Sequence, residues 1–98
     1  MLEAQLQREA RQLAAGLGLF TVALPRLANM GNPPGWPDLM ILGPRGLLFR
    51  ELKSADGRPS RAHLAIGGIL RQLGQDWAIW RPADLDSGRI GRELWEIA

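Results

Sequence analysis

Three residues in the middle of the chain have the types and the spacing for metal-assisted chemistry on a phosphate ester. They are Asp38, Glu51 and Lys53. Successive side chains of a strand alternate between its two faces, so Glu51 and Lys53 point the same way while Leu52 points into the opposite layer. The spacing therefore predicts an acid and an amine side by side on one face of a sheet.

A hairpin would bring Asp38 to this pair. Apolar runs over residues 39–42 and 47–49 flank a four-residue turn, Gly43-Pro44-Arg45-Gly46, and this pattern is typical of two antiparallel strands. In such a hairpin the start of the first strand lies across from the end of the second. We therefore expect Asp38 to face Glu51.

Two neighbouring carboxylates point to a divalent metal. They repel each other and raise each other's pKa unless a cation joins them. A small set of hard oxygen ligands suits Mg²⁺ or Mn²⁺, with water and a substrate phosphate completing the coordination shell. Asp38 and Glu51 are the expected metal ligands, and the backbone carbonyl of Leu52 is a further candidate. The Lys53 ammonium could hold an attacking water and offset the charge that grows on phosphorus.

The order and spacing of these motifs resemble a known nuclease family. The motifs are Gly35-Trp36-Pro37-Asp38, Glu51-Leu52-Lys53-Ser54 and Gly57-Arg58-Pro59-Ser60, the last opening a helix. They are similar to the VRR-NUC branch of the PD-(D/E)XK nuclease superfamily, in its small stand-alone form common in phages and bacteria, from about residue 3 to about residue 80. The resemblance implies an α/β fold with a restriction-endonuclease-like core, in which a small mixed sheet is flanked by helices.

The resemblance also implies roles for individual residues. In that family the Asp and the Glu of the two motifs bind the metal, the Lys serves the attacking water, and an acid on the first helix completes the site. Asp38, Glu51 and Lys53 match these positions directly. For the helix acid the resemblance favours Glu3 over Glu9, whereas helical periodicity puts both at opposite edges of the apolar face and does not choose between them.

One position departs from the family pattern. The helix after the Lys usually carries a Gln near its start, in Ser-x-x-Gln, whereas this chain has Ser60-Arg61-Ala62-His63. His63 can still donate a hydrogen bond to a phosphate or a water, with a charge that depends on pH. We therefore count it among the catalytic candidates.

Arginine dominates the basic residues of the chain. The net charge is only +2, and Lys53 is the one lysine among the twelve cations. Arginines that bracket the expected site are candidates to contact DNA phosphates, namely Arg26, Arg45, Arg50, Arg58 and Arg61. Each of them could equally be a solvated surface charge.

The remaining pattern predicts one compact α/β domain over residues 1–98. Beside the hairpin we expect a helix over residues 2–17, a strand over 19–24, a helix from the N-cap Ser60 to Gly74, a strand over 76–80 and a final helix over 87–97. The predicted apolar stripes of the three helices are Leu2, Leu6, Leu13 and Leu17; Ile66, Ile69, Leu70 and Leu73; and Ile90, Leu94 and Ile97. In the loop over residues 25–36, Trp36 either packs or contacts nucleic acid.

Composition narrows the class of protein. The chain has no cysteine, no apolar run long enough to span a membrane, and a polar N-terminus, so we expect a cytoplasmic protein of a bacterium or of a phage in its host. The pair Gly67-Gly68 would let another backbone come close, and a homodimer would enlarge the DNA surface and present two sites.

The expected function is a metal-dependent DNA endonuclease. The resemblance further implies branched DNA, such as a four-way junction, as the substrate. A non-catalytic DNA-binding or assembly module with the same fold is the alternative, and intact Asp38, Glu51 and Lys53 argue against it. A toxin or restriction-type effector ranks lowest because no sequence-reading helix is evident.

Overall fold

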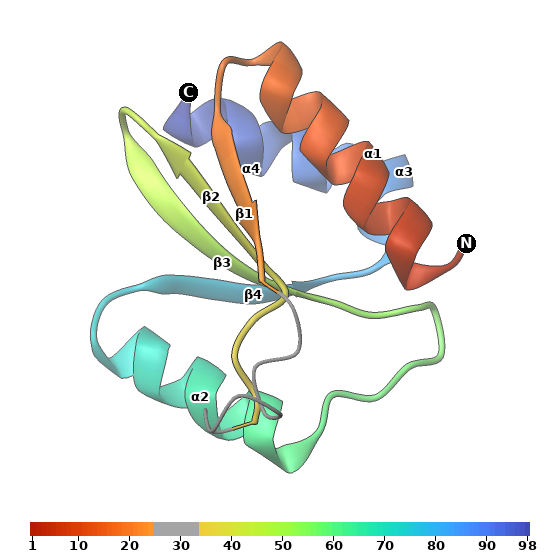
Figure 1. The fold of residues 1–98 in the computed structure, drawn as a ribbon, viewed down its shortest axis with the longest axis vertical. Helices are drawn as coiled ribbons and strands as arrows, with labels where there is room; N and C mark the ends of the chain where they lie inside the picture. Colours follow the sequence, from red (N-terminus) through yellow and green to blue (C-terminus); the bar gives the residue numbers. More distant parts are fainter. Residues whose placement is uncertain (25–33) are drawn as a thin grey trace.

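The computed structural model describes residues 1–24 and 34–98. Their elements are α1 (Glu3–Gly16), β1 (Phe20–Ala23), β2 (Leu39–Gly43), β3 (Gly46–Leu52), α2 (Arg61–Gln72), β4 (Asp76–Trp80), α3 (Pro82–Asp86) and α4 (Arg89–Ile97) (Figure 1). The predicted helices and strands are all present, with ends shifted by one or two residues. The exception is the stretch after Pro82, where the sequence predicted no helix before residue 87.

The sheet is mixed and has the strand order β1-β2-β3-β4. The first three strands are antiparallel, and β4 is parallel to β3. A parallel neighbour needs a crossover, and α2 supplies it between β3 and β4. Because β3 lies inside the sheet with helices over both faces, its last five residues are all buried.

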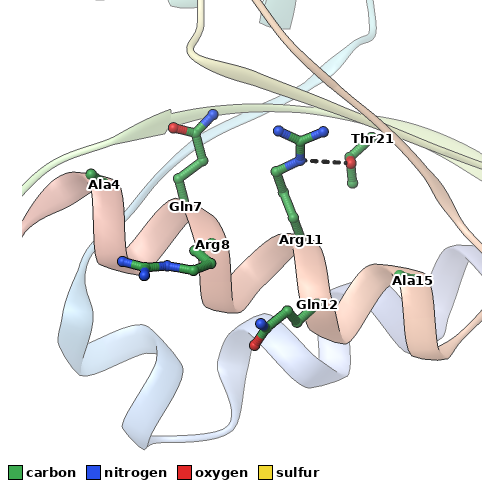
Figure 2. Close-up of a pocket in the computed structure, with 7 residues that line it drawn as sticks. All are labelled: Ala4, Gln7, Arg8, Arg11, Gln12, Ala15 and Thr21. Atoms are coloured by element: carbon green, nitrogen blue, oxygen red, sulfur yellow. Dashed lines mark hydrogen bonds between the residues drawn. The ribbon is translucent and has the colours of Figure 1, made fainter.

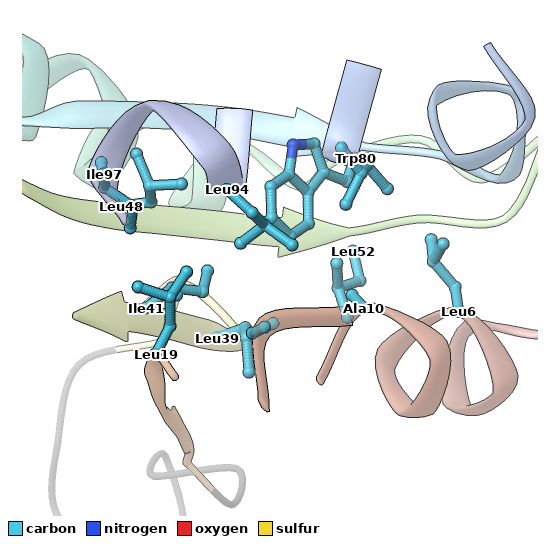
Figure 3. Close-up of a cluster of buried hydrophobic side chains, with 12 residues drawn as sticks. Leu6, Ala10, Leu19, Leu39, Ile41, Leu48, Leu52, Trp80, Leu94 and Ile97 are labelled. Carbon is cyan, nitrogen blue, oxygen red and sulfur yellow. The ribbon is translucent and has the colours of Figure 1, made fainter. Parts of the chain in front are cut away.

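Helices cover the sheet from both sides (Figure 1). Against one face lie α1, α3 and α4, and the larger core fills the space between them and the sheet and includes Trp80 of β4 (Figure 3). Against the other face lies α2, whose Leu70 packs with Phe49 and Trp77 in a smaller core. The domain thus has the small mixed sheet flanked by helices that the resemblance implied.

The first helix buries only part of the predicted stripe. Leu6, Ala10 and Ala14 are its buried residues, spaced four apart, whereas Leu2 is 75% exposed and Leu13 is 43% exposed. Ala10 and Ala14 let the helix backbone approach the core closely and take the place of Leu13, while Leu6 is buried as predicted and Leu17 packs partly buried against the core.

The α2 stripe was also wrong in part. Leu70 is buried, but Ile69 and Leu73 are mostly exposed. Gly67 is buried against the indole of Trp77, and a Cβ there would collide with that ring. Its role is therefore to make room for a side chain of its own chain. A Cβ at Gly68 would meet no described atom within 4 Å.

The last helix follows its predicted face, since Ile90, Leu94 and Ile97 are all buried. Pro82 begins a separate short helix because proline suits the first turn, and Asp84 caps it by accepting a hydrogen bond of 2.7 Å from the Arg81 N–H. Of the helices in residues 1–24 and 34–98, none is long and apolar enough to cross a lipid bilayer.

Candidate active site

The hairpin places Asp38 directly across from Glu51. Leu39 pairs with Arg50 in the antiparallel register, so the residue before Leu39 lies opposite the residue after Arg50. The Asp38 carboxylate is held in place because its Oδ2 accepts a hydrogen bond of 2.9 Å from the Leu52 N–H. The two acids that the sequence placed near each other are therefore neighbours, at the start of β2 and the end of β3.

The glycine turn that precedes Asp38 lies against α2. Gly35 has a φ of +100°, a backbone conformation that favours glycine, and a Cβ there would collide with the backbone of Ala62 in the first turn of α2. Trp36 stacks edge-on against Phe49, with 6.0 Å between ring centroids. Trp36 thus packs, one of the two roles predicted for it, and it keeps 38% of its surface exposed.

Glu51 is an ionisable group in a buried position. Only 1% of the residue is exposed. The pKa of Glu51 is raised to about 9, chiefly by burial and then by the neighbouring Asp38 carboxylate, while the Lys53 ammonium opposes both. A carboxylate in this setting favours either a proton or a cation.

His63 links α2 to Glu51. It occupies the third position of α2, where its N–H donates to the Ser60 hydroxyl at 3.1 Å, and its Nδ1 accepts from the Ser60 N–H at 3.3 Å. With Nδ1 as acceptor, the neutral ring carries its proton on Nε2, which lies 2.5 Å from Oε2 of Glu51. The histidine therefore takes the place of the usual Gln or Glu of a capping box and also contacts the candidate metal ligand.

The structure brings Glu3 to Lys53. The Glu3 Oε1 lies 3.9 Å from the Lys53 Nζ, so the first turn of α1 reaches the end of β3. Glu9 lies two turns further along, and its Oε2 is buried without a hydrogen-bond partner in the described residues. Of the two acids between which periodicity did not choose, Glu3 is thus the one beside the Lys53 ammonium.

Leu52 behaves as the alternation predicted. Its side chain is buried in the larger core, opposite the face of Glu51. Its N–H points towards Asp38, and since the N–H and C=O of one residue point to the same side of a strand, its carbonyl also lies on the Asp38 side.

The donor set fits a hard divalent cation. It consists of the Asp38 and Glu51 carboxylates with the Leu52 carbonyl, which are all oxygen ligands. Residues 1–24 and 34–98 contain no group of three or more His, Cys, Asp or Glu side chains arranged to hold a metal ion. Such a cation would therefore need water and substrate oxygens to complete its shell.

The candidate DNA-binding arginines lie in different surroundings. Arg58 and Arg61 are exposed and flank the N-terminus of α2, beside His63. Arg45 is exposed in the turn between β2 and β3, at the end of the hairpin opposite Asp38. The prediction for Arg26 lies outside the described residues.

Arg50 cannot contact phosphates in this structure, and that expectation was wrong. It is 1% exposed, because it points into the core opposite Glu51, where it stacks on Trp80 and pairs with Glu93 and Asp76. Although burial alone would raise the pKa of Glu93, hydrogen bonds from Trp80, Arg89 and Arg50 lower it.

Arg81 is a structural residue of the site that sequence reasoning missed. Its Nη1 donates to the carbonyls of Ser54 and Gly57, at 2.8 and 2.7 Å, and so closes the segment that follows Lys53. Only its place just after the predicted strand over residues 76–80 could have drawn attention to it, because the partners are backbone groups and leave no sequence motif.

The fold and these side chains define a class of protein: an α/β domain whose small mixed sheet, flanked by helices, carries two acids and a lysine at the ends of two strands. Among solved structures it is similar to a VRR_NUC domain, with a TM-score of 0.72 and 24% identity over 89% of this chain and 92% of that chain. It is also similar to a VRR_NUC domain protein, with a TM-score of 0.59 and 19% identity over 80% of this chain and 66% of that chain. The chain has the VRR-NUC fold, as the motifs indicated.

Comparisons of the sequence, in contrast to those of the fold, give no match. No protein-family profile matches it. No curated protein matches it significantly.

Proposed function

We propose that this protein is a metal-dependent nuclease that hydrolyses DNA phosphodiester bonds. One observation carries the proposal: Asp38 and Glu51 lie opposite each other across the hairpin, and the Glu51 carboxylate is buried. Burying an acid beside a second acid costs stability, so a role that needs its charge explains its presence. The fold shared with VRR_NUC domain structures supports the same activity.

The chain's own residues would divide the work. Asp38, Glu51 and the Leu52 carbonyl would hold Mg²⁺ or Mn²⁺, which would supply a Lewis acid at the scissile phosphate. Lys53, which is partly exposed, would orient the attacking water and offset the negative charge that grows in the transition state. Glu3, at 3.9 Å, would orient the Lys53 ammonium.

The main role of His63 would be to position the Glu51 carboxylate and not to contact DNA. Its Nε2–H points at Glu51, so it would fix the rotamer of that carboxylate. Exposed Arg58 and Arg61, at the start of α2, would contact the DNA backbone. Branched DNA such as a four-way junction is the proposed substrate, and a homodimer is the proposed form, because two sites would then act on two strands.

The test is cleavage of labelled single-stranded, duplex, flap and four-way junction DNA in Mn²⁺. We expect the wild type to cut at least the junction and Lys53→Ala to lose that activity, while circular dichroism shows the variant folded. Arg92→Gln, an exposed change on α4, is the matched control and should cut normally. Equal activity of wild type and Lys53→Ala, or no cutting of any DNA form by the wild type, would contradict the proposal.

One contact favours the second candidate, a DNA-binding module without catalysis. His63 already occupies the Oε2 side of Glu51, where a cation would otherwise have a free approach. In that case the wild type would bind DNA without any divalent cation, and Asp38→Asn would bind it equally well. Neither protein would cut DNA.

A further inference from the structure

A groove of about 510 Å³ runs along the outer side of α1, next to the edge strand β1 (Figure 2). Its lining is polar and basic, and consists of Ala4, Gln7, Arg8, Arg11, Gln12, Ala15 and Thr21. Two of these residues are arginines and none is acidic. A groove with this lining favours an anion, and none of the candidate phosphate contacts considered above lies in it.

One row of α1 connects the groove to the active site. Side chains four residues apart lie above one another on a helix, so Glu3, Gln7 and Arg11 form a single row. Glu3 lies at the Lys53 ammonium, while Gln7 and Arg11 line the groove and project to the same side of the helix (Figure 2). The groove therefore follows the same row of α1 that carries Glu3 at the proposed site.

Arg11 is held ready for a ligand. Its Nε donates to the Thr21 hydroxyl at 3.1 Å, which ties the side chain to β1 (Figure 2). In the part of the chain that the structure describes, its two terminal nitrogens have no hydrogen-bond acceptor. A guanidinium anchored through Nε presents those two nitrogens as a fork, the geometry that binds two oxygens of one phosphate.

We propose that this groove binds the phosphodiester backbone of the DNA substrate, with Arg8 and Arg11 as the phosphate contacts. The inference rests on the nuclease function proposed above. From Glu3 to Arg11 the helix rises about 12 Å. At about 3.4 Å per nucleotide this distance corresponds to about three to four nucleotides. Arg11 would therefore contact the backbone at that distance from the cleaved bond.

The test is the salt dependence of DNA binding. Fluorescence anisotropy with a labelled 30-base-pair duplex, in EDTA between 50 and 200 mM salt, measures binding without cleavage. Loss of one phosphate contact lowers the slope of log K against log salt by about one and weakens binding roughly fivefold near 0.15 M salt. We expect this result for Arg11→Gln, about twice the change in slope for Arg8→Gln with Arg11→Gln, and no change for the exposed control Arg92→Gln.

Thr21→Val separates a positioned arginine from a mere positive charge. We expect Thr21→Val to weaken binding in the wild type and to have no further effect when Arg11→Gln is already present. Equal slopes for wild type and the double arginine variant, with both folded by circular dichroism, would overturn the proposal. A Thr21→Val that changes nothing in the wild type would overturn the positioned contact at Arg11.

These results can be told apart from failure of the nuclease function. If the wild type binds through Arg8 and Arg11 but cuts no DNA in Mn²⁺, the groove stands and the proposed activity fails. If the wild type cuts DNA and the arginine variants keep the wild-type salt slope, the activity stands and the groove does not bind the backbone.

Discussion

Replacing Glu51 by Gln should stabilise the protein when no divalent cation is bound. The Glu51 carboxyl is 1% exposed and faces Asp38, and burial together with that neighbour raises its pKa to about 9 from an ordinary value of 4.5. At neutral pH the folded protein must therefore either keep a proton that the unfolded chain releases or bear a buried charge. Glutamine has nearly the same shape and carries no charge, so it removes this cost.

The size and the sign of the effect follow from the pKa. An acid whose pKa is raised by folding stabilises the fold fully below its ordinary pKa and loses that stabilisation as the pH rises towards the folded value. Each pH unit between 4.5 and about 9 costs about 1.36 kcal/mol. At pH 7.5, three units above 4.5, the cost is at most about 4 kcal/mol, so we expect Glu51→Gln to gain roughly 1–4 kcal/mol.

The assay is urea unfolding in EDTA at several pH values between 4.5 and 9.5. The wild type should lose unfolding free energy as the pH rises to about 9, and Glu51→Gln should show a flatter profile. Glu96→Gln, a change at an exposed residue of α4, should follow the wild type. Mn²⁺ should stabilise the wild type and not Glu51→Gln. A Glu51→Gln protein that is no more stable than the wild type at pH 7.5, with the same pH profile, would refute the reasoning.

Three further predictions concern the residues that build the site. Gly35→Ala forces a Cβ into the backbone of α2 at a φ of +100°, so it should lower the unfolding free energy by at least about 1 kcal/mol in urea and reduce cleavage by displacing Asp38; unchanged values would contradict this. Glu93→Gln weakens the pair with buried Arg50. The pKa of Glu93 is lowered, so the stabilisation that this carboxylate gives is present above its ordinary pKa and is lost as the pH falls. The variant should therefore be less stable at pH 7, and its unfolding free energy should fall less steeply below pH 4.5. A fall as steep as that of the wild type would contradict this prediction. Arg81→Met removes the hydrogen bonds to the carbonyls of the segment after Lys53. Limited proteolysis should therefore cut that segment faster, and cleavage of DNA should slow. Equal proteolysis rates would contradict the role of Arg81 in holding the segment.

The central part of the fold could be predicted because its signals are local. Alternating side chains and the Gly-Pro turn over residues 43–46 define the hairpin, and the hairpin alone puts Asp38 opposite Glu51. The N-cap at Ser60 likewise follows from the sequence of the first turn of α2. These features depend on neighbours in the chain, which a pattern of residues can specify.

The rest depends on contacts between distant segments. Arg50 looked like a surface cation beside the site, but strand alternation turns it to the face opposite Glu51, where Glu93 of α4 compensates its charge. Gly67 looked like a contact for a second subunit, and its partner is Trp77 of the same chain. The choice of Glu3 over Glu9 needed the packing of α1 against the end of β3, which helical periodicity alone does not contain.

The most direct test of the central claim is calorimetric titration of Mn²⁺ into the wild type, Asp38→Asn and Glu51→Gln. The claim is that these two carboxylates, joined across the hairpin, hold one divalent cation. It predicts a saturable site with one Mn²⁺ per chain in the wild type and loss of that site in either variant. Binding of Mn²⁺ to both variants as tightly as to the wild type, or no binding to the wild type with and without DNA, would contradict it.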